Sequence, residues 1–239
     1  PRRRTMKLRT LVPILLLAAA PAAAQTATLC QADSQPGRQQ SPIDITGAVP
    51  APLRRLDYGY PALQGRACST GHNIQVNVPP GDSIVVDGTS FMLEEFHFHW
   101  PAEHTLDGHS YPVEIHMVHK RAGRVVVLAT WVEEGAANPA WDSIWATFPR
   151  IANGRDTVTV TVDIRELFAI RDLNAERIYT YCGSLTTGDY EEGVTWLVRA
   201  APIRMSTAQI ALLRRAMTCY SRATQPLNGR PIRYRRAGR

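Results

Sequence analysis

The histidines of this sequence are gathered in one stretch of the chain. The chain has 239 residues, yet all seven histidines lie between positions 72 and 119: His72, His97, His99, His104, His109, His116 and His119. Two of them alternate with aromatic residues in Phe96-His97-Phe98-His99-Trp100. Side chains at i and i+2 of a β-strand share one face and lie about 6.6 Å apart along the chain. His97 and His99 are therefore placed to bind one metal ion together.

A third imidazole would complete a catalytic zinc site, in which three protein ligands leave one of four positions open. The segment from Glu114 to His119 offers His116 and His119, and because their parity differs, only one can share the ligand face. A His-x-His pair alone is more often a chance or surface pair. Acids two positions before His97 and His116, namely Glu95 and Glu114, favour the zinc interpretation, because a carboxylate there can fix the ring's second nitrogen.

Strand-like segments surround these histidines. Apolar runs separated by Gly, Pro and Asp predict strands at 73–78, 83–88, 91–100, 113–119, 125–132, 157–162 and 194–198. The clearest helix signal is the capping box Ser206-Thr207-Ala208-Gln209, and Asp163-Ile164-Arg165-Glu166 could open a shorter helix. The chain has no internal repeat and no long linker, so we expect one mainly β domain over residues 25–239.

The net charge of +6 is concentrated at the two ends of the sequence. Residues 1–24 contain five basic residues and no acid, and five more arginines lie in the last ten residues, so the segment between is slightly acidic. We expect no nucleic-acid partner. Lys7 and Arg9 precede an apolar run that ends in three alanines before Gln25, which is typical of a secretory signal peptide, with residues 1–5 lying upstream of Met6. We expect a periplasmic or secreted protein, and a retained membrane span is the less favoured alternative because prolines interrupt the run.

Four cysteines follow this leader: Cys30, Cys68, Cys182 and Cys219. An oxidising compartment permits disulfides, and four cysteines allow three complete pairings that the sequence does not distinguish. Buried free thiols are the alternative. No Cys-x-x-Cys spacing occurs, which disfavours a cysteine zinc knuckle or a redox motif.

Six separated motifs resemble the α-type carbonic anhydrases: QSPIDI, EFHFHW, AEHTLDG, YPVEIHMVH, GSLTT and EGVTW, in family order between about residues 40 and 230. The resemblance implies a large, twisted, mostly antiparallel central sheet with short peripheral helices. It also implies a lyase that reversibly hydrates carbon dioxide to bicarbonate and a proton by a zinc-bound hydroxide. The alternatives are a catalytically silent relative that binds a partner and a zinc-carrying protein. The oligomeric state stays open.

The resemblance also implies a role for each matching residue. The zinc ligands would be His97, His99 and His116, with Glu95 and Glu114 behind them. Thr186 and Glu103 would orient the hydroxide, and His72 would relay its proton. The substrate-binding wall would comprise Val118, Val127, Leu185, Thr186, Thr187 and Trp196. His104 would be structural, and His109 and His119 would have no catalytic role.

The sequence departs from the family around position 188. The family's Thr-Thr-Pro-Pro-Cys is replaced by Thr186-Thr187-Gly188-Asp189-Tyr190, and Glu95 stands where glutamine is usual. In many secreted relatives the lost cysteine pairs with one near the N-terminus, so Cys30 is expected to lack that partner. If the backbone dihedral angles suit proline, the double substitution Gly188→Pro with Asp189→Pro, which restores the family's two prolines, should raise the melting temperature.

Overall fold

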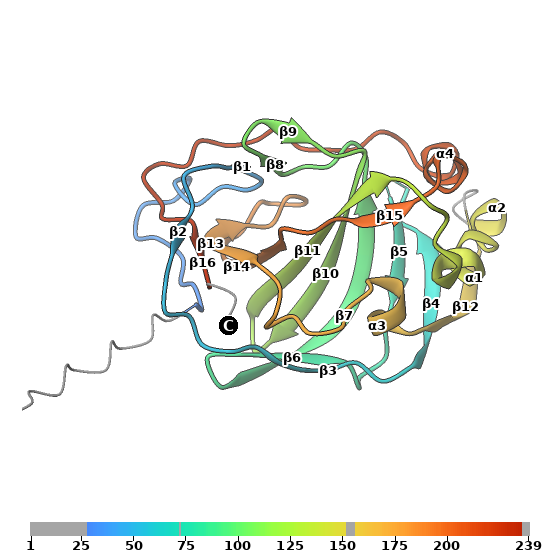
Figure 1. The fold of residues 1–239 in the computed structure, drawn as a ribbon, viewed down its shortest axis with the longest axis horizontal. Helices are drawn as coiled ribbons and strands as arrows, with labels where there is room; N and C mark the ends of the chain where they lie inside the picture. Colours follow the sequence, from blue (N-terminus) through green and yellow to red (C-terminus); the bar gives the residue numbers. More distant parts are fainter. Residues whose placement is uncertain (1–27, 72, 152–155, 236–239) are drawn as a thin grey trace, which may run out of the picture.

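The computed structural model describes residues 28–71, 73–151 and 156–235, and one large sheet is the main element of this part of the chain (Figure 1). Its strands are, in spatial order, β12 (Thr157–Val162), β4 (Leu63–Ser69), β5 (Ile74–Asn77), β7 (Thr89–His99), β10 (Val113–Arg121), β11 (Arg124–Glu134), β14 (Glu192–Arg199), β13 (Ile178–Ser184), β16 (Arg233–Tyr234) and β2 (Val49–Pro50). β15 (Ile203–Met205) pairs with β11, and β6 (Ser83–Val86) joins β7 to β3 (Asp57–Gly59). A smaller sheet contains β1 (Asp44–Ile45), β8 (Thr105–Leu106) and β9 (His109–Ser110).

Most neighbouring strands of the large sheet run antiparallel. The exceptions among the described strands are β11, which is parallel to β14 and β15, and β16, which is parallel to β2. The sheet is therefore mixed, and the mainly β fold with short peripheral helices is confirmed. All seven strands expected from the sequence are present, whereas β4 and β13 were not predicted.

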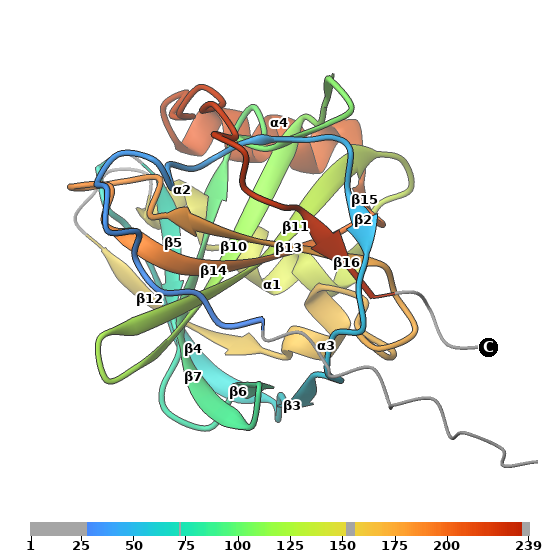
Figure 2. The same cartoon turned by 90° about the vertical axis from the view of Figure 1, so that its left-hand side faces the viewer.

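The helices are short and lie at the periphery. They are the 3-10 helix η1 (Pro139–Trp141), α1 (Asp142–Trp145), α2 (Phe148–Ile151), α3 (Ile164–Leu167) and α4 (Thr207–Ala216). Ser206 and Gln209 cap α4 reciprocally, and the Asp163 side chain accepts two backbone N–H bonds at the start of α3, so both predicted helix starts are confirmed. α1, α2 and α4 gather near β12 and β4, away from the C-terminal strand β16 (Figures 1 and 2). Within the described ranges, no helix is long and apolar enough to cross a membrane.

A β-bulge sets which face of β7 carries the histidines. Val118 of β10 pairs with Glu95, but the next residue of β10 pairs with Leu93, so Glu94 is an extra residue in β7. Before the bulge, Phe91 and Leu93 face the larger apolar core, and after it Phe96 and Phe98 do. The bulge therefore turns Glu95, His97 and His99 together to the opposite face of the sheet.

One buried carboxylate lies away from these histidines. Asp82, just before β6, is fully buried, and neither of its side-chain oxygens has a hydrogen-bond partner. Burial and, to a smaller extent, the negative charge of Asp163 together raise the pKa of Asp82 to about 7. The same carboxylate contributes to the raised pKa of Tyr60, for which burial is the larger cause.

Candidate metal centre and active site

Three histidines converge on one face of the large sheet. His97 and His99 come from β7, and His116 of β10 is directly opposite His97 in the antiparallel register. One ring nitrogen from each lies within 4.8 Å of the others, and all three side chains are buried or nearly so. The ring centroids are 4.5–5.3 Å apart. Alternation along β10 puts His119 on the opposite face, where its Nε2 lies 3.1 Å from the Tyr60 hydroxyl.

The second nitrogen of each ring is held by a fixed acceptor. His97 Nδ1 donates to Glu95 at 2.9 Å, His99 Nδ1 donates to the Tyr220 carbonyl at 3.3 Å, and His116 Nε2 donates to Glu114 at 2.9 Å. These bonds leave His97 Nε2, His99 Nε2 and His116 Nδ1 as lone-pair donors. His99 Nε2 is buried without a hydrogen-bond partner, an arrangement that costs free energy unless a ligand fills it. The three residues therefore fit a metal ion that prefers nitrogen ligands.

Burial keeps two of these imidazoles neutral, which is the form that can bind a metal. It lowers the pKa of His116 to about 4 and the pKa of His99 well below its usual value, and the neighbouring histidines lower that of His99 further. Burial also lowers the pKa of His97, but the Glu95 carboxylate outweighs it and holds that pKa above its ordinary value.

Glu114 ties the ligand His116 to a wider polar network. Its carboxylate accepts the backbone N–H groups of Glu103 and His104, His104 Nδ1–H at 2.7 Å, and His116 Nε2–H. Burial raises the pKa of Glu114, but the interactions with His104 and His116 outweigh it and hold the pKa well below its usual value. His104 Nε2 in turn accepts from the Tyr181 hydroxyl at 2.6 Å. These contacts explain the grouping of His104, Glu114 and His116 without a second metal ion.

Glu103 and Thr186 lie together beside His99. Glu103 Oε1 accepts the Arg222 backbone N–H at 2.9 Å and is 3.3 Å from His99 Nδ1. Burial raises the pKa of Glu103 to about 7, while the Arg222 N–H and the Thr186 hydroxyl lower it. Glu103 Oε2 is buried and has no hydrogen-bond partner. The Thr186 hydroxyl is nevertheless near enough to lower the pKa of the Glu103 carboxyl group.

An apolar row borders the histidines. Val118 of β10 pairs with Val127 of β11, which pairs with Trp196 of β14. All three are buried in one cluster against which Leu185 packs, and the Trp196 ring lies 4.9 Å from that of His116. Val118 is two residues from His116 and therefore continues the same face of β10. Thr187 follows Thr186 and is half-buried.

The remaining histidines lie apart from the three ligands. His109 is exposed in β9 and contacts the Tyr111 ring. His72 lies outside the described residues, as does the leader expected at residues 1–24. Sequence reasoning missed Tyr220, Arg222 and Tyr181. Tyr220 and Arg222 act through backbone groups, which every residue type except proline provides, so the residue type gives no indication of this role. Tyr181 lies near the site only because strands distant in the sequence pair with one another.

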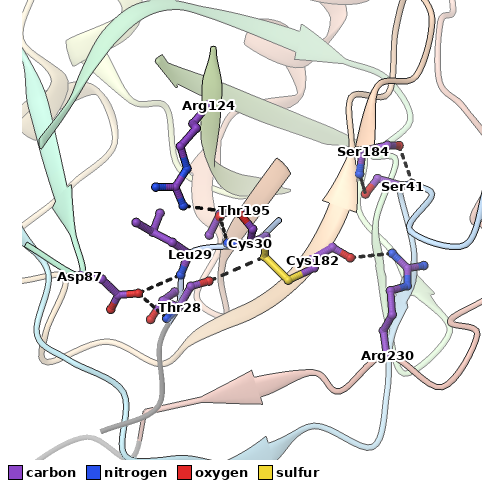
Figure 3. The surroundings of a disulfide bond; sticks show 10 residues. All are labelled: Thr28, Leu29, Cys30, Ser41, Asp87, Arg124, Cys182, Ser184, Thr195 and Arg230. Carbon is purple, nitrogen blue, oxygen red and sulfur yellow. Dashed lines mark hydrogen bonds between the residues drawn. A yellow bond between two sulfur atoms is a disulfide. The ribbon is translucent and has the colours of Figure 1, made fainter. Parts of the chain in front are cut away.

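As expected, Cys30 does not pair with a cysteine of the 186–190 loop, which contains none. Cys30 forms a disulfide with Cys182 on β13, with Cα atoms 5.4 Å apart (Figure 3). The partner thus precedes the Gly183-Ser184-Leu185-Thr186 segment, whereas the family's cysteine follows it. Cys68 and Cys219 are free thiols. The disulfide is typical of a protein outside the cytoplasm.

The prediction that prolines at positions 188 and 189 raise the melting temperature required backbone angles that suit proline, and the structure does not provide them at Gly188. Gly188 has φ +64° and Tyr190 has φ +57°. Proline is locked near −65°, so it does not fit at Gly188. The loop therefore follows a path that a proline at position 188 would not allow.

Fold and site together define a mainly β enzyme with a buried three-histidine metal centre. The chain belongs to the eukaryotic-type carbonic anhydrase family, whose profile matches residues 25–236. It is accordingly a lyase that hydrates carbon dioxide to bicarbonate, and its three-histidine cluster is a group that can hold a metal ion.

Bacterial carbonic anhydrases are among the proteins most similar to this chain. The carbonic anhydrase of Pectobacterium carotovorum is 38% identical over 198 residues, which cover 82% of this chain and 80% of that protein. The carbonic anhydrase of Klebsiella pneumoniae is 38% identical over 202 residues, with 83% and 80% covered. The solved structure of Photobacterium profundum α-carbonic anhydrase superposes with a TM-score of 0.76 at 35% identity, over 83% of this chain and 90% of that one.

Proposed function

We propose that His97, His99 and His116 hold one zinc ion and that carbon dioxide is hydrated there, outside the cytoplasm. The observation that carries this proposal is the set of three ring nitrogens within 4.8 Å of one another, each on a ring whose other nitrogen already donates to a fixed acceptor. Three neutral imidazoles are a ligand set of catalytic zinc, with the fourth position left to water. Zinc lowers the pKa of such a water to about 7, an effect for which carbonic anhydrases are the standard example.

Thr186 and Glu103 would orient the nucleophile. An ionised carboxylate can only accept hydrogen bonds, so the Thr186 proton must point to Glu103. The Thr186 oxygen is then left to accept a hydrogen bond from the attacking oxygen, which turns a lone pair toward the substrate. Glu103 Oε2, which has no other hydrogen-bond partner, is the atom available to accept a hydrogen bond from the Thr186 hydroxyl, and the positive charge of a bound metal favours the ionised carboxylate that this requires.

The apolar row would receive carbon dioxide. Val118, Val127 and Trp196 are buried beside His116, and Leu185 packs on their cluster. Carbon dioxide has no net dipole and gains little from charged groups, so apolar side chains suit it. Thr187 would line the polar side of this space.

His72 would carry the proton away. Its imidazole has an ordinary pKa of about 6.5, close to that of a zinc-bound water, so relay costs little free energy. The proposal rests on the position of His72 in the sequence, after the last residue of β4 and before the first residue of β5, because His72 itself lies outside the described residues. A signal peptide at residues 1–24 and a periplasmic or secreted location accord with the disulfide and the bacterial relatives.

Stopped-flow hydration of carbon dioxide by protein of measured zinc content tests the function. We expect His116→Ala to lose zinc and activity. The matched control is His119→Ala, which removes a buried histidine from the opposite face and should keep the metal. Full zinc retention in His116→Ala would refute the ligand assignment.

Two further variants separate catalysis from metal binding. Thr186→Ala should keep zinc but lower kcat/KM by about 10²-fold, the scale for removing one positioned polar group at a reacting centre. His72→Ala should be slow in dilute buffer and recover with added imidazole. A silent, partner-binding relative would instead show no hydration in the fully zinc-loaded wild type.

A further inference from the structure

The loop that departs from the family is held in a strained conformation. Tyr190 has φ +57°, a backbone region that bulky side chains rarely occupy. Such a conformation persists only where the surroundings enforce it, and it is often found at functional sites. The loop begins at Thr186, so whatever holds Tyr190 also bears on the position of Thr186.

Two hydrogen bonds and one ring contact hold Tyr190. Its backbone N–H donates to the Thr187 carbonyl at 3.4 Å, and the Gln40 amide donates to its carbonyl at 3.3 Å. The guanidinium of Arg222 lies 3.7 Å from the centroid of the Tyr190 ring. A cation at this distance from an aromatic face is attracted by the ring's quadrupole.

Arg222 connects this ring to the carboxylate of Glu103. Its backbone N–H donates to Glu103 Oε1 at 2.9 Å, while its guanidinium donates to the Ser41 carbonyl at 2.6 Å. The side chain of Arg222 is therefore fixed at both the Tyr190 ring and the Ser41 carbonyl, and the amide that orients Glu103 belongs to the same residue. Glu103 and Thr186 are thus linked twice, by direct proximity and through Tyr190 and Arg222.

We propose that Tyr190 is a positioning residue for carbon dioxide hydration: by stacking on Arg222 it fixes both the start of its own loop, at Thr186, and the amide that orients Glu103. This inference rests on the proposed roles of Thr186 and Glu103. In this chain an aromatic–arginine contact takes over the rigidity that the family obtains from two prolines.

Substitutions at Tyr190 separate the ring from the backbone strain. Tyr190→Ala should lower kcat/KM about threefold to tenfold at unchanged zinc content, and Tyr190→Phe should restore it to within about twofold because the ring face remains. Tyr190→Gly removes the backbone strain, because glycine adopts a positive φ freely, but it also removes the ring. Its kcat/KM should therefore be as low as that of the alanine variant. Arg222→Ala keeps the backbone amide and should show a similar loss, and combining it with Tyr190→Ala should add little.

Tyr234→Ala is the matched control. The Tyr234 ring also stacks on an arginine, Arg177, at 4.8 Å, but it lies on β16. We expect this variant to change the melting temperature without changing kcat/KM. Hydrogen–deuterium exchange supplies a readout independent of activity: Tyr190→Ala should speed exchange at the Arg222 amide and in residues 186–190, and Tyr234→Ala should not.

The outcomes distinguish this inference from the proposed function. If Thr186→Ala hydrates carbon dioxide at the wild-type rate, the orienting role itself is wrong. If Thr186→Ala is slow but Tyr190→Ala equals the wild type in kcat/KM, or Tyr190→Gly is restored while Tyr190→Phe is not, the positioning role of the Tyr190 ring is overturned.

Discussion

Replacing Asp82 by asparagine should change the stability of the protein more favourably at pH 8 than at pH 5. The Asp82 carboxylate is fully buried without a hydrogen-bond partner, and burial raises its pKa from 3.8 to about 7. At pH values between about 3.8 and about 7, Asp82 carries a proton in the folded state but has released it in the unfolded state. Folding stability therefore falls as pH rises through this interval and levels off above pH 7. The charged group that acts on Asp82 is Asp163, and Tyr60, whose own pKa the Asp82 charge raises, stays neutral in this pH range.

The magnitude follows from the size of the pKa shift. A rise from 3.8 to about 7 corresponds to about 4 kcal/mol, because one unit is worth about 1.4 kcal/mol. Of this, about 3 kcal/mol is lost between pH 5 and pH 8. Asparagine is neutral throughout, and any constant cost of its unpaired amide cancels in the comparison of the two pH values. The stability gained by Asp82→Asn should therefore be greater at pH 8 than at pH 5 by about 3 kcal/mol.

Urea denaturation of both proteins at pH 5 and pH 8 measures this difference. Asp87→Asn is the matched control, because Asp87 Oδ2 accepts the backbone N–H groups of Thr28 and Leu29. Removing that charge should destabilise the protein at both pH values. The reasoning is refuted if the gain from Asp82→Asn is the same at pH 5 and pH 8.

Three further substitutions test the loop, the disulfide and the carboxylate behind His97. Gly188→Pro should lower the melting temperature, because φ at this position is +64°, and a higher melting temperature would contradict the described loop path. Replacing both Cys30 and Cys182 by serine should cost about 2–4 kcal/mol in urea denaturation, since the bond closes a loop with a sequence separation of 152, and unchanged stability would show that the bond is absent. Glu95→Gln should speed loss of metal to a chelator by up to about tenfold, because a neutral amide accepts the His97 N–H more weakly than a carboxylate; an equal rate would remove Glu95 from this role.

The central strands could be predicted because their residues alternate. His97 and His99 lie on one face of β7, and His116 but not His119 joins them, as a period of two requires. β4 gave a weak signal because its inward positions are small. A Cβ at Gly65 would lie 2.8 Å from a methyl group of Val162, so the close approach of β12 requires glycine there.

The long-range contacts of the site could not be predicted from one sequence. The Tyr220 carbonyl that holds His99 is 121 residues away from it, and a carbonyl group is common to every residue type. The disulfide between Cys30 and Cys182 was one of several open pairings. The positive φ of Tyr190 was also hidden, because no local rule assigns a bulky residue to that region.

One short segment of the chain holds two different parts of the active site through its backbone. Tyr220 presents its carbonyl to His99, and two residues later Arg222 presents its N–H to Glu103. A carbonyl and an amide two positions apart on an extended chain project to the same side, so both are aimed at once if the segment keeps its path. That path is fixed by the bridge between Trp100 and Tyr220 and by the Arg222 side chain. The geometry of His99 and Glu103 therefore depends on the register of this segment rather than on the residue type at either backbone position. Arg222 is the exception, because its side chain also carries the contact to Tyr190.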